Sequence, residues 1–428
     1  MSAAQRLDEV FGLPEGSEVY VLNDFKSSAY DAVRLFETWA STSFAISRFT
    51  PVRRMKVLRA RLSRLANTTI NVTICRGALK RRISTMKVEM IYLSQEDVIR
   101  CGGMSMDKAV DDLEEVFRLY DKGDYILPGK IVMKRPEPNA EETTGRINAM
   151  PGYIGGRFNM PGIKWDRQRS AESVQVRPAA RLGRDRAERS RDQGTLAVMD
   201  GTLISTIRTG AVTGVCAKYM APSRSKTVGL FGAGPQCKTQ LMALKASLPQ
   251  LEKAYVYDLS RERTEKFAAE MSQKLNMDVQ AASDRLATIE SGDILVTATT
   301  ATEQIIHGAE IKKGVYVAHL GNNEVDEELI LRADKVVIDD WETDKHRMGD
   351  TMAYMFRDGK IDDSRIDASV SDLVAGRKSG RDNDDQLTYT CNVGLGLYDV
   401  AIAARVYQYA KENGIGQKLK LWDEPIMV

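Results

Sequence analysis

Two closely spaced glycines and a later aspartate form the pattern with the clearest chemical meaning in this sequence. Gly232 and Gly234 follow an apolar run, 227–231, and precede a stretch with helical spacing. Asp258 closes a second apolar run, 24 residues after Gly234. In a strand–turn–helix–strand unit, Gly232 would allow a tight turn, and Gly234 would let the backbone approach a pyrophosphate at the helix N-terminus. The pattern therefore predicts a dinucleotide-binding site.

Asp258 bears on which dinucleotide this would be. A carboxylate at the end of the second strand can accept hydrogen bonds from a ribose 2′-hydroxyl, and it would repel a 2′-phosphate. This favours NAD(H) as the cofactor, although Arg261 and Arg263 lie close by in the sequence and leave NADP(H) open. Cys237 occupies the place of the third glycine of the usual fingerprint, so the match is imperfect.

The elements that must position these residues alternate between strands and helices. Beyond Asp258, further apolar strands are expected at 293–298, 314–321 and 335–339, with helices between them. This alternation predicts an α/β fold whose Rossmann-type parallel sheet places residues 297–300 and 320–323 at strand C-termini, where ligands of such sheets bind. We expect the cofactor to contact Gly232, Ala233, Gly234, Pro235, Gln236, Asp258, Arg263, Thr297, Ala298, Thr299 and Gly321.

The region before this sheet has its own patterned elements. A strand is expected at 90–93 and a helix at 106–120. Asp200-Gly201 is a hairpin-turn signal, and a helix is expected from about Ser205 to Ala221 with Arg208 in its first turn. In that place the guanidinium and the helix N-terminus could together hold a carboxylate.

The two ends of the chain differ in character. Residues 1–88 are poorly patterned, and we interpret them as a solvated or disordered extension, the alternative being an arm for an anionic partner. The last long helix, 397–413, carries an apolar stripe. We expect that helix to return to the first patterned region or to pack on a partner subunit.

The segment 167–193 breaks the pattern, because it holds eight arginines in 27 residues and has no apolar period. One interpretation is a solvated basic insertion. The other is a pair of compensating frameshifts, since codons for 170–193 can be chosen so that a one-nucleotide shift encodes APNPSKFGLPRASAGIVLNDPET, a string with a turn, a β-rich run and a second turn. The nucleotide sequence across codons 166–194 decides between them.

Composition excludes several classes of protein. The chain has 428 residues and a net charge of +2, so it can bury one large or two ordinary domains and gives no reason to expect nucleic acid or membrane as a partner. No apolar run approaches the roughly 20 residues of a spanning helix, and we see no signal-peptide pattern. Five scattered cysteines fit reduced thiols in a cytoplasm, and three dispersed histidines predict no metal site.

Several motifs, in this order and spacing, resemble the ornithine cyclodeaminase/mu-crystallin family: 148–153 (NAMPGY), 162–164 (GIK), 196–213 (LAVMDGT to IRTGAVT), 231–236 (FGAGPQ) and 375–381 (AGRKSGR). The string from the shifted frame is similar to the same family. The resemblance implies a homodimer in which a Rossmann NAD(P)-binding domain, 221–344, is inserted into an α+β substrate-binding and dimerisation domain, 89–220 with 345–428. It also implies NAD(P)-dependent chemistry on amino acids or their imines.

The resemblance also implies roles for individual residues. Arg208 matches the family's carboxylate-binding arginine, and Lys164 matches its substrate lysine, which can hydrogen-bond an imine or relay a proton. Lys130 stands where the family often has a second carboxylate-binding arginine, although Lys134 or Arg135 could substitute. Lysine offers a point charge there instead of a fork.

Two positions depart from ornithine-cyclising members of that family. Asn148 and Asn323 replace a glutamate and an aspartate, and an amide cannot act as a general base. We therefore expect hydride transfer to or from the α-carbon of an amino or imino acid, with Lys164 and Asn323 or Glu324 as the catalytic groups. Glu324 could replace the lost acid, which leaves cyclodeamination of ornithine or a homologue as one alternative. The other alternative is a protein that binds NAD(P)H without turnover.

Overall fold

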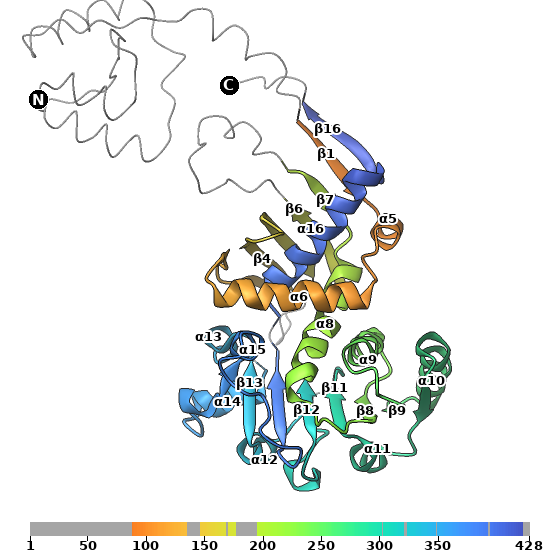
Figure 1. Ribbon diagram of the computed structural model, residues 1–428, viewed down its shortest axis with the longest axis vertical. Helices are drawn as coiled ribbons and strands as arrows, with labels where there is room; N and C mark the ends of the chain where they lie inside the picture. The colour runs from red at the N-terminus through yellow and green to blue at the C-terminus, as the bar shows by residue number, and fades with distance from the viewer. Residues whose placement is uncertain are drawn as a thin grey trace, which may run out of the picture. The chain divides into compact units, whose positions relative to one another are not determined.

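The structure is a computed structural model, and it describes residues 88–134, 146–167, 170–176, 195–301, 303–320, 323–347, 349–392 and 394–422 (Figure 1). The predictions for 1–87, and for 177–194 within the arginine-rich segment, lie outside the described residues. Two eight-stranded sheets make up the fold, and both lie in one compact unit. We call them the parallel sheet and the mixed sheet.

The parallel sheet has the strand order β10-β9-β8-β11-β12-β15-β13-β14, and every pair of neighbouring strands is parallel. Its strands are β8 (Thr227–Phe231), β9 (Lys253–Tyr257), β10 (Asp278–Ala281), β11 (Ile294–Thr297), β12 (Tyr316–His319), β13 (Lys335–Ile338), β14 (Ala368–Ser369) and β15 (Thr388–Cys391). The chain order reverses between β8 and β11, so the sheet has the switch point at which Rossmann-type folds bind dinucleotides.

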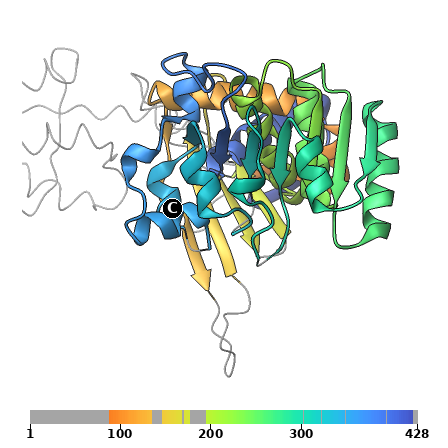
Figure 2. The ribbon, with the colours of Figure 1, turned by 90° about the horizontal axis from the view of Figure 1, so that it is seen from below.

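Helices bury both faces of this sheet, as Figures 1 and 2 show. Alternate residues of one strand therefore belong to different cores: Ile294 and Val296 of β11 lie in one apolar cluster, and Leu295 lies in the other. The covering helices are α9 (Pro235–Ser247), α10 (Arg261–Leu275), α11 (Arg285–Ser291), α12 (Glu327–Arg332), α13 (Trp341–Asp344), α14 (Thr351–Arg357) and α15 (Val370–Val374).

The mixed sheet has the order β16-β1-β7-β6-β5-β4-β2, and β3 also pairs with β4. Its strands are β1 (Val88–Leu93), β2 (Tyr125–Ile126), β3 (Ile131–Lys134), β4 (Arg146–Ile154), β5 (Met160–Arg167), β6 (Ser170–Val176), β7 (Ala197–Met199) and β16 (Gln417–Trp422). The first part of the arginine-rich segment thus forms a strand between β5 and β7. This strand was not expected from the sequence, and the choice between a solvated insertion and a pair of frameshifts remains open.

The helices of the mixed sheet begin where their sequences supply caps. In α5 (Gln95–Arg100), Ser94 and Asp97 form a reciprocal capping box. The amphipathic helix α6 (Met106–Asp121) buries its apolar stripe and ends before Gly123, whose φ is +69°. These elements follow the sequence-based expectation closely.

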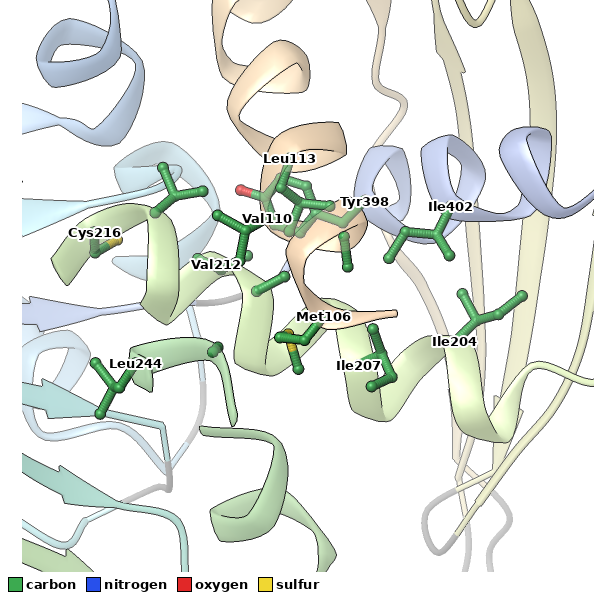
Figure 3. Packing of buried hydrophobic residues seen from close by; sticks show 14 of the residues in the cluster. Met106, Val110, Leu113, Ile204, Ile207, Val212, Cys216, Leu244, Tyr398 and Ile402 are labelled. Carbon is green, nitrogen blue, oxygen red and sulfur yellow. The ribbon is translucent and has the colours of Figure 1, made fainter. Parts of the chain in front are cut away.

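Helices α8 (Thr202–Met220) and α16 (Gly396–Asn413) connect the two sheets through one continuous apolar core (Figure 3). Met106 and Leu113 of α6, Ile207 of α8, Leu244 of α9 and Tyr398 of α16 all contribute to it. Gly210 allows a close helix crossing, because a Cβ there would lie 2.4 Å from the Thr239 carbonyl oxygen on α9. The helix that carries Arg208 is therefore packed directly on the helix that follows the glycine turn.

Three expectations need correction. Asp200-Gly201 does not form a hairpin: Asp200 accepts a hydrogen bond from the Leu203 backbone nitrogen and starts α8. Because α8 begins at Thr202, Arg208 is its seventh residue and lies beyond the first turn, so the helix N-terminus does not reinforce its charge.

The third correction concerns the C-terminal third of the chain. The polar region after Trp341 contains β15, which lies between β12 and β13 in the parallel sheet. The parallel sheet therefore extends past residue 344. The division into domains at that residue remains a prediction.

No helix in the described ranges has the length and apolarity that a membrane crossing requires. The four cysteines in the described part of the chain, Cys101, Cys216, Cys237 and Cys391, are buried and unpaired.

Candidate active site

Lys164 is a buried lysine in the middle of β5, with only 1% of its side chain exposed. Its Nζ lies 3.2 Å from the Ser205 hydroxyl on α8 and 3.4 Å from carboxylate oxygens of both Asp166 and Asp399. Burial lowers the pKa of Lys164 below its ordinary value of 10.5, while the Asp399 charge works in the opposite direction. Its ammonium is thus held by acids in a site from which water is largely excluded.

Arg208 approaches the same carboxylate from α8. Its Nε lies 3.6 Å from Asp399 Oδ2, and the Asp399 side chain at the start of α16 is fully buried. The guanidinium also lies against the backbone of Gly394, and a Cβ added at Gly394 would clash with the arginine. The structure therefore brings Lys164 and Arg208 together around Asp399.

Two further positions that the sequence analysis considered on the substrate side, Asn148 and Lys130, lie near these two cations. Asn148 is buried on β4 and donates to Asp166 Oδ1 from across the strand pair. Lys130 is exposed and lines a small pocket with Met150 and Gly394, so it lies on the Arg208 side of the site. A second cation near a bound carboxylate is consistent with this arrangement.

The glycine turn has the shape that a bound phosphate needs. Gly232 has a φ of +103°, and a Cβ there would lie 3.1 Å from the Ala298 oxygen, so only glycine fits comfortably. Gly234 caps α9 and has no atom within 4 Å of the place a Cβ would take, while Pro235 fills the first helical position. This open cradle of backbone in front of a helix N-terminus fits a pyrophosphate.

Cys237 explains how the turn tolerates the loss of the third glycine. Its side chain is fully buried, and its Sγ donates a hydrogen bond of 3.2 Å to the Phe231 carbonyl oxygen. Burial raises the pKa of this thiol, and the nearby Glu324 and Asp258 charges raise it further. The cysteine is thus an inert neutral group that ties the first turn of α9 to the end of β8. Next to it, Gln236 has a buried Oε1 that makes no hydrogen bond to the described residues.

Asp258 lies beside the glycine turn. Its Oδ2 accepts a 2.9 Å hydrogen bond from the Ala233 backbone nitrogen, and its Oδ1 accepts from Ser260 and from the mostly exposed Arg263. Asp258 therefore holds the turn to the end of β9 and is paired with Arg263.

The turn after β11 is fixed to the turn after β8. The backbone nitrogen of Ala298 donates to the Phe231 oxygen, and Thr297 is fully buried. Thr299 donates through its backbone nitrogen to Glu324 Oε1 at 2.7 Å. Glu324 is fully buried, and this hydrogen bond fixes it to the turn after β11. Its catalytic role remains a prediction.

Asn323 is half-buried and accepts a 3.0 Å hydrogen bond from the Thr351 hydroxyl at the start of α14. Gly321 lies outside the described residues. The predicted residues thus form two groups, one around Lys164 on the mixed sheet and one around Gly232 on the parallel sheet, joined by the α8–α9 crossing.

Sequence reasoning missed Asp399 and Ser205. The signal for Asp399 was present, because it is an acid at the start of a helix whose other positions form an apolar stripe. Ser205 gave no signal, since its role depends on the position of β5 against α8.

His319, Asp350 and Cys391 are buried, and their possible ligand atoms lie within 4.8 Å of one another, which chain spacing could not show. Hydrogen bonds within the protein account for this cluster: His319 pairs with Tyr389 at 2.8 Å, and Cys391 donates to Asp350 at 3.2 Å. The absence of a metal site remains a prediction.

The chain is similar to a known protein family and to individual relatives. The pattern of the ornithine cyclodeaminase/mu-crystallin family matches residues 89–414. N-((2S)-2-amino-2-carboxyethyl)-L-glutamate dehydrogenase of Staphylococcus aureus is 28% identical, over 79% of this chain and 100% of the relative.

Two solved structures are similar over nearly the whole of their own length. Delta(1)-pyrroline-2-carboxylate reductase of Thermococcus litoralis, in complex with NADH and L-proline, is 29% identical with a TM-score of 0.67, covering 77% of this chain and 99% of its own. An archaeal alanine dehydrogenase dimer with bound NAD is 28% identical with a TM-score of 0.66, covering 78% and 100%. The chain belongs to the ornithine cyclodeaminase/mu-crystallin family.

Proposed function

We propose that this protein is an NAD(P)(H)-dependent oxidoreductase that transfers hydride to or from the α-carbon of an amino or imino acid. The observation that carries this proposal is the pair of cations, Lys164 and Arg208, held around the buried carboxylate of Asp399. A site of this kind suits a small carboxylate whose neighbouring nitrogen needs a proton. The relatives named above, a reductase of a cyclic imino acid and two amino acid dehydrogenases, support the same chemistry.

The three cations of the site have different proposed roles. Arg208 would bind the substrate carboxylate through its terminal nitrogens, and Lys130 would add a second positive charge at the rim. Lys164 would hydrogen-bond the imine nitrogen and give it a proton during reduction, or receive one during oxidation. In reduction the α-carbon gains a hydride and the nitrogen gains a proton, so the carbon–nitrogen double bond becomes a single bond. Bound NAD(H) supplies or accepts that hydride.

The cofactor side is organised by backbone. The open cradle at Gly234 would hold the pyrophosphate, and Asp258 would contact the ribose. Asn323 would line the amine side through its amide nitrogen, because its oxygen already accepts from Thr351. We propose NAD(H) as the preferred cofactor. Arg263, paired with Asp258 at 2.9 Å, keeps NADP(H) open.

Cyclodeamination of ornithine is the second candidate. It needs general bases for the substrate amines, and Asn148 and Asn323 cannot serve as such. The observation that favours it is that Asp166 lies 3.4 Å from Lys164 and accepts from Asn148, so a carboxylate is still present on that side of the site. A protein that binds NAD(P)H without turnover is the third candidate.

A homodimer is part of this proposal. Cross-strand neighbours of the mixed sheet point the same way, and one face presents four large apolar side chains of which 40% to 64% is exposed: Ile131, Met133, Ile147 and Trp165. The opposite face holds Lys164 and Asn148, both of which are buried. An apolar face of this kind is typical of an interface between subunits. We also propose the cytoplasm as the compartment, in keeping with the unpaired cysteines.

The test is a substrate screen with purified protein. Cyclic and acyclic imino acids are mixed with NADH or NADPH, and the loss of absorbance of the reduced nicotinamide is followed. The expected result is turnover of at least one imino acid, and loss of that turnover in Arg208→Met with NADH affinity unchanged. Formation of proline and ammonia from ornithine and NAD⁺ would favour cyclodeamination. Tight NADH binding without turnover of any compound would favour the non-catalytic candidate.

A further inference from the structure

Asp399 has an unusual environment for an ionisable group. It lies in the first turn of α16 with none of its side chain exposed, and neither carboxylate oxygen makes a hydrogen bond within the described residues. A buried carboxylate normally collects several hydrogen bonds, because its desolvation is costly. Its near neighbours are instead two cations, Lys164 at 3.4 Å and Arg208 at 3.6 Å.

Resting on the proposed function, we propose that Asp399 is a positioning residue that sets the charge and geometry of both substrate-binding cations. Lys164 reaches it from β5 and Arg208 reaches it from α8, so this one carboxylate joins two elements that otherwise bring two positive charges together. Asp399 supplies the negative charge that these two cations share, and Asp166 supplies a second one beside Lys164 alone. Without Asp399, Asp166 would be the one carboxylate left within 4 Å of either cation among the described residues, and it does not reach Arg208.

The geometry with Arg208 suits this role. The contact is made through Nε, the nitrogen nearest the helix backbone, and Gly394 packs against the terminal nitrogens. The side chain is therefore fixed from two sides, by Asp399 at Nε and by the backbone of Gly394 at the fork.

Asp399 also acts on the proton of Lys164. Among the described residues, the charged groups that act on that ammonium are Asp166 on its own strand, Arg208 on α8 and Asp399 on α16. Burial and Arg208 lower the pKa of Lys164, and the charge of Asp399 is the largest single influence that raises it. Removing the Asp399 charge therefore lowers this pKa further, and the lysine loses its proton at a lower pH.

The experiment compares Asp399→Asn with the wild-type protein and with Asp399→Glu. The control is Asp112→Asn on α6, which removes a carboxylate that is equally buried but paired with Arg405 and Arg157 in the core. Two quantities are measured: the pH dependence of kcat for imine reduction, and the affinity of the NADH-loaded protein for pyrrole-2-carboxylate, a planar anion without a reducible imine.

For Asp399→Asn we expect the high-pH limb of kcat to move down by roughly one unit or more, while pyrrole-2-carboxylate binds no more weakly than before. Asp399→Glu should restore most of the wild-type limb, and Asp112→Asn should lose stability without moving it. An unmoved limb in Asp399→Asn, or an equal loss of kcat and of anion affinity, would overturn the inference.

Stability gives an independent test. If Asp399→Asn leaves two buried cations without the negative charge that they share, then Lys164→Met in the same chain relieves the repulsion, and the double variant unfolds at a higher temperature than Asp399→Asn alone. Equal unfolding temperatures would refute a role through Lys164. Because this comparison needs no substrate, a wild-type protein that reduces no imino acid would refute the proposed function and leave the inference about Asp399 to be judged separately.

Discussion

The helix crossing at Gly210 allows a prediction that joins stability to function. In Gly210→Ala, the new Cβ would lie 2.4 Å from the Thr239 oxygen and 2.7 Å from its carbonyl carbon, about 1 Å closer than ordinary contact. Both atoms belong to the backbone of α9, so the two helices must move apart. Overpacking of this kind costs about 1–3 kcal/mol, and the better helix propensity of alanine offsets about 1 kcal/mol. Because the atoms that the new Cβ contacts belong to the backbone and cannot rotate away, we expect the unfolding free energy to fall by about 1–2 kcal/mol.

The assay is thermal unfolding together with calorimetric titration of NADH. In a unit of this size, a loss of about 1–2 kcal/mol should lower the unfolding midpoint by about 1–3 °C. Since Arg208 lies two residues before Gly210, the substrate KM should rise as well. NADH affinity is measured as well, because Thr239 lies five residues after Gly234, on the helix that follows the glycine turn.

Gly234→Ala is the matched control. No atom lies within 4 Å of its added Cβ, and its φ of −92° suits any residue. We expect the unfolding midpoint to be unchanged and NADH binding to be lost, since the methyl group would occupy the cradle. A Gly210→Ala variant that melts at or above the wild-type temperature would refute the close crossing, and unchanged NADH binding in Gly234→Ala would refute the cradle.

Three further predictions concern single side chains. Arg208→Lys keeps the charge and loses the fork, so the substrate KM should rise about 10- to 100-fold with NADH affinity constant; an unchanged KM would exclude Arg208 as the anchor. Arg263→Ala removes the cation paired with Asp258, so NADPH affinity should fall about tenfold while NADH affinity stays within about twofold. Both affinities are measured by fluorescence titration, and equal effects on the two would contradict a position of Arg263 beside the ribose 2′-substituent. Because the folded pKa of Lys164 lies below 10.5, the unfolded chain binds more protons between these two values. The unfolding free energy of the wild type should therefore rise relative to that of Lys164→Met as pH increases toward 10.5, and a flat difference would show that the lysine is not perturbed.

The parallel sheet was largely predictable from the sequence because each of its elements is coded locally. Apolar runs of four or five residues bounded by glycines and polar turns mark β8 and β11, and Gly234-Pro235 marks the start of α9. The strand β15 was missed because Thr388–Cys391 follows a long polar stretch and has threonine at two of its four positions. Its assignment depends on the gap between β12 and β13, which is a property of the whole sheet.

The candidate site was predictable in part for the same reason. Lys164 and Arg208 stand in motifs that resemble a known family, so a single sequence was enough to choose them. Their common partner Asp399 lies 191 residues beyond Arg208 and becomes visible only when α16 packs against β5 and α8. The hairpin expected at Asp200-Gly201 failed for a related reason: the same side chain that favours a tight turn also caps a helix, and the tertiary fold selected the helix.

The place of β15 and β16 in the two sheets has a consequence for the order in which the protein can be made. β15 lies between β12 and β13, and β16 lies beside β1. Neither sheet can therefore be completed until most of the chain has left the ribosome. Until residue 391 has left the ribosome, the position of β15 between β12 and β13 is unfilled, and each of these strands lacks a partner on that side. A premature stop shortly before Thr388 would therefore give a polypeptide that retains the glycine turn but has unpaired strand edges in both sheets. We expect such a polypeptide to aggregate or to be bound by chaperones and degraded by proteases.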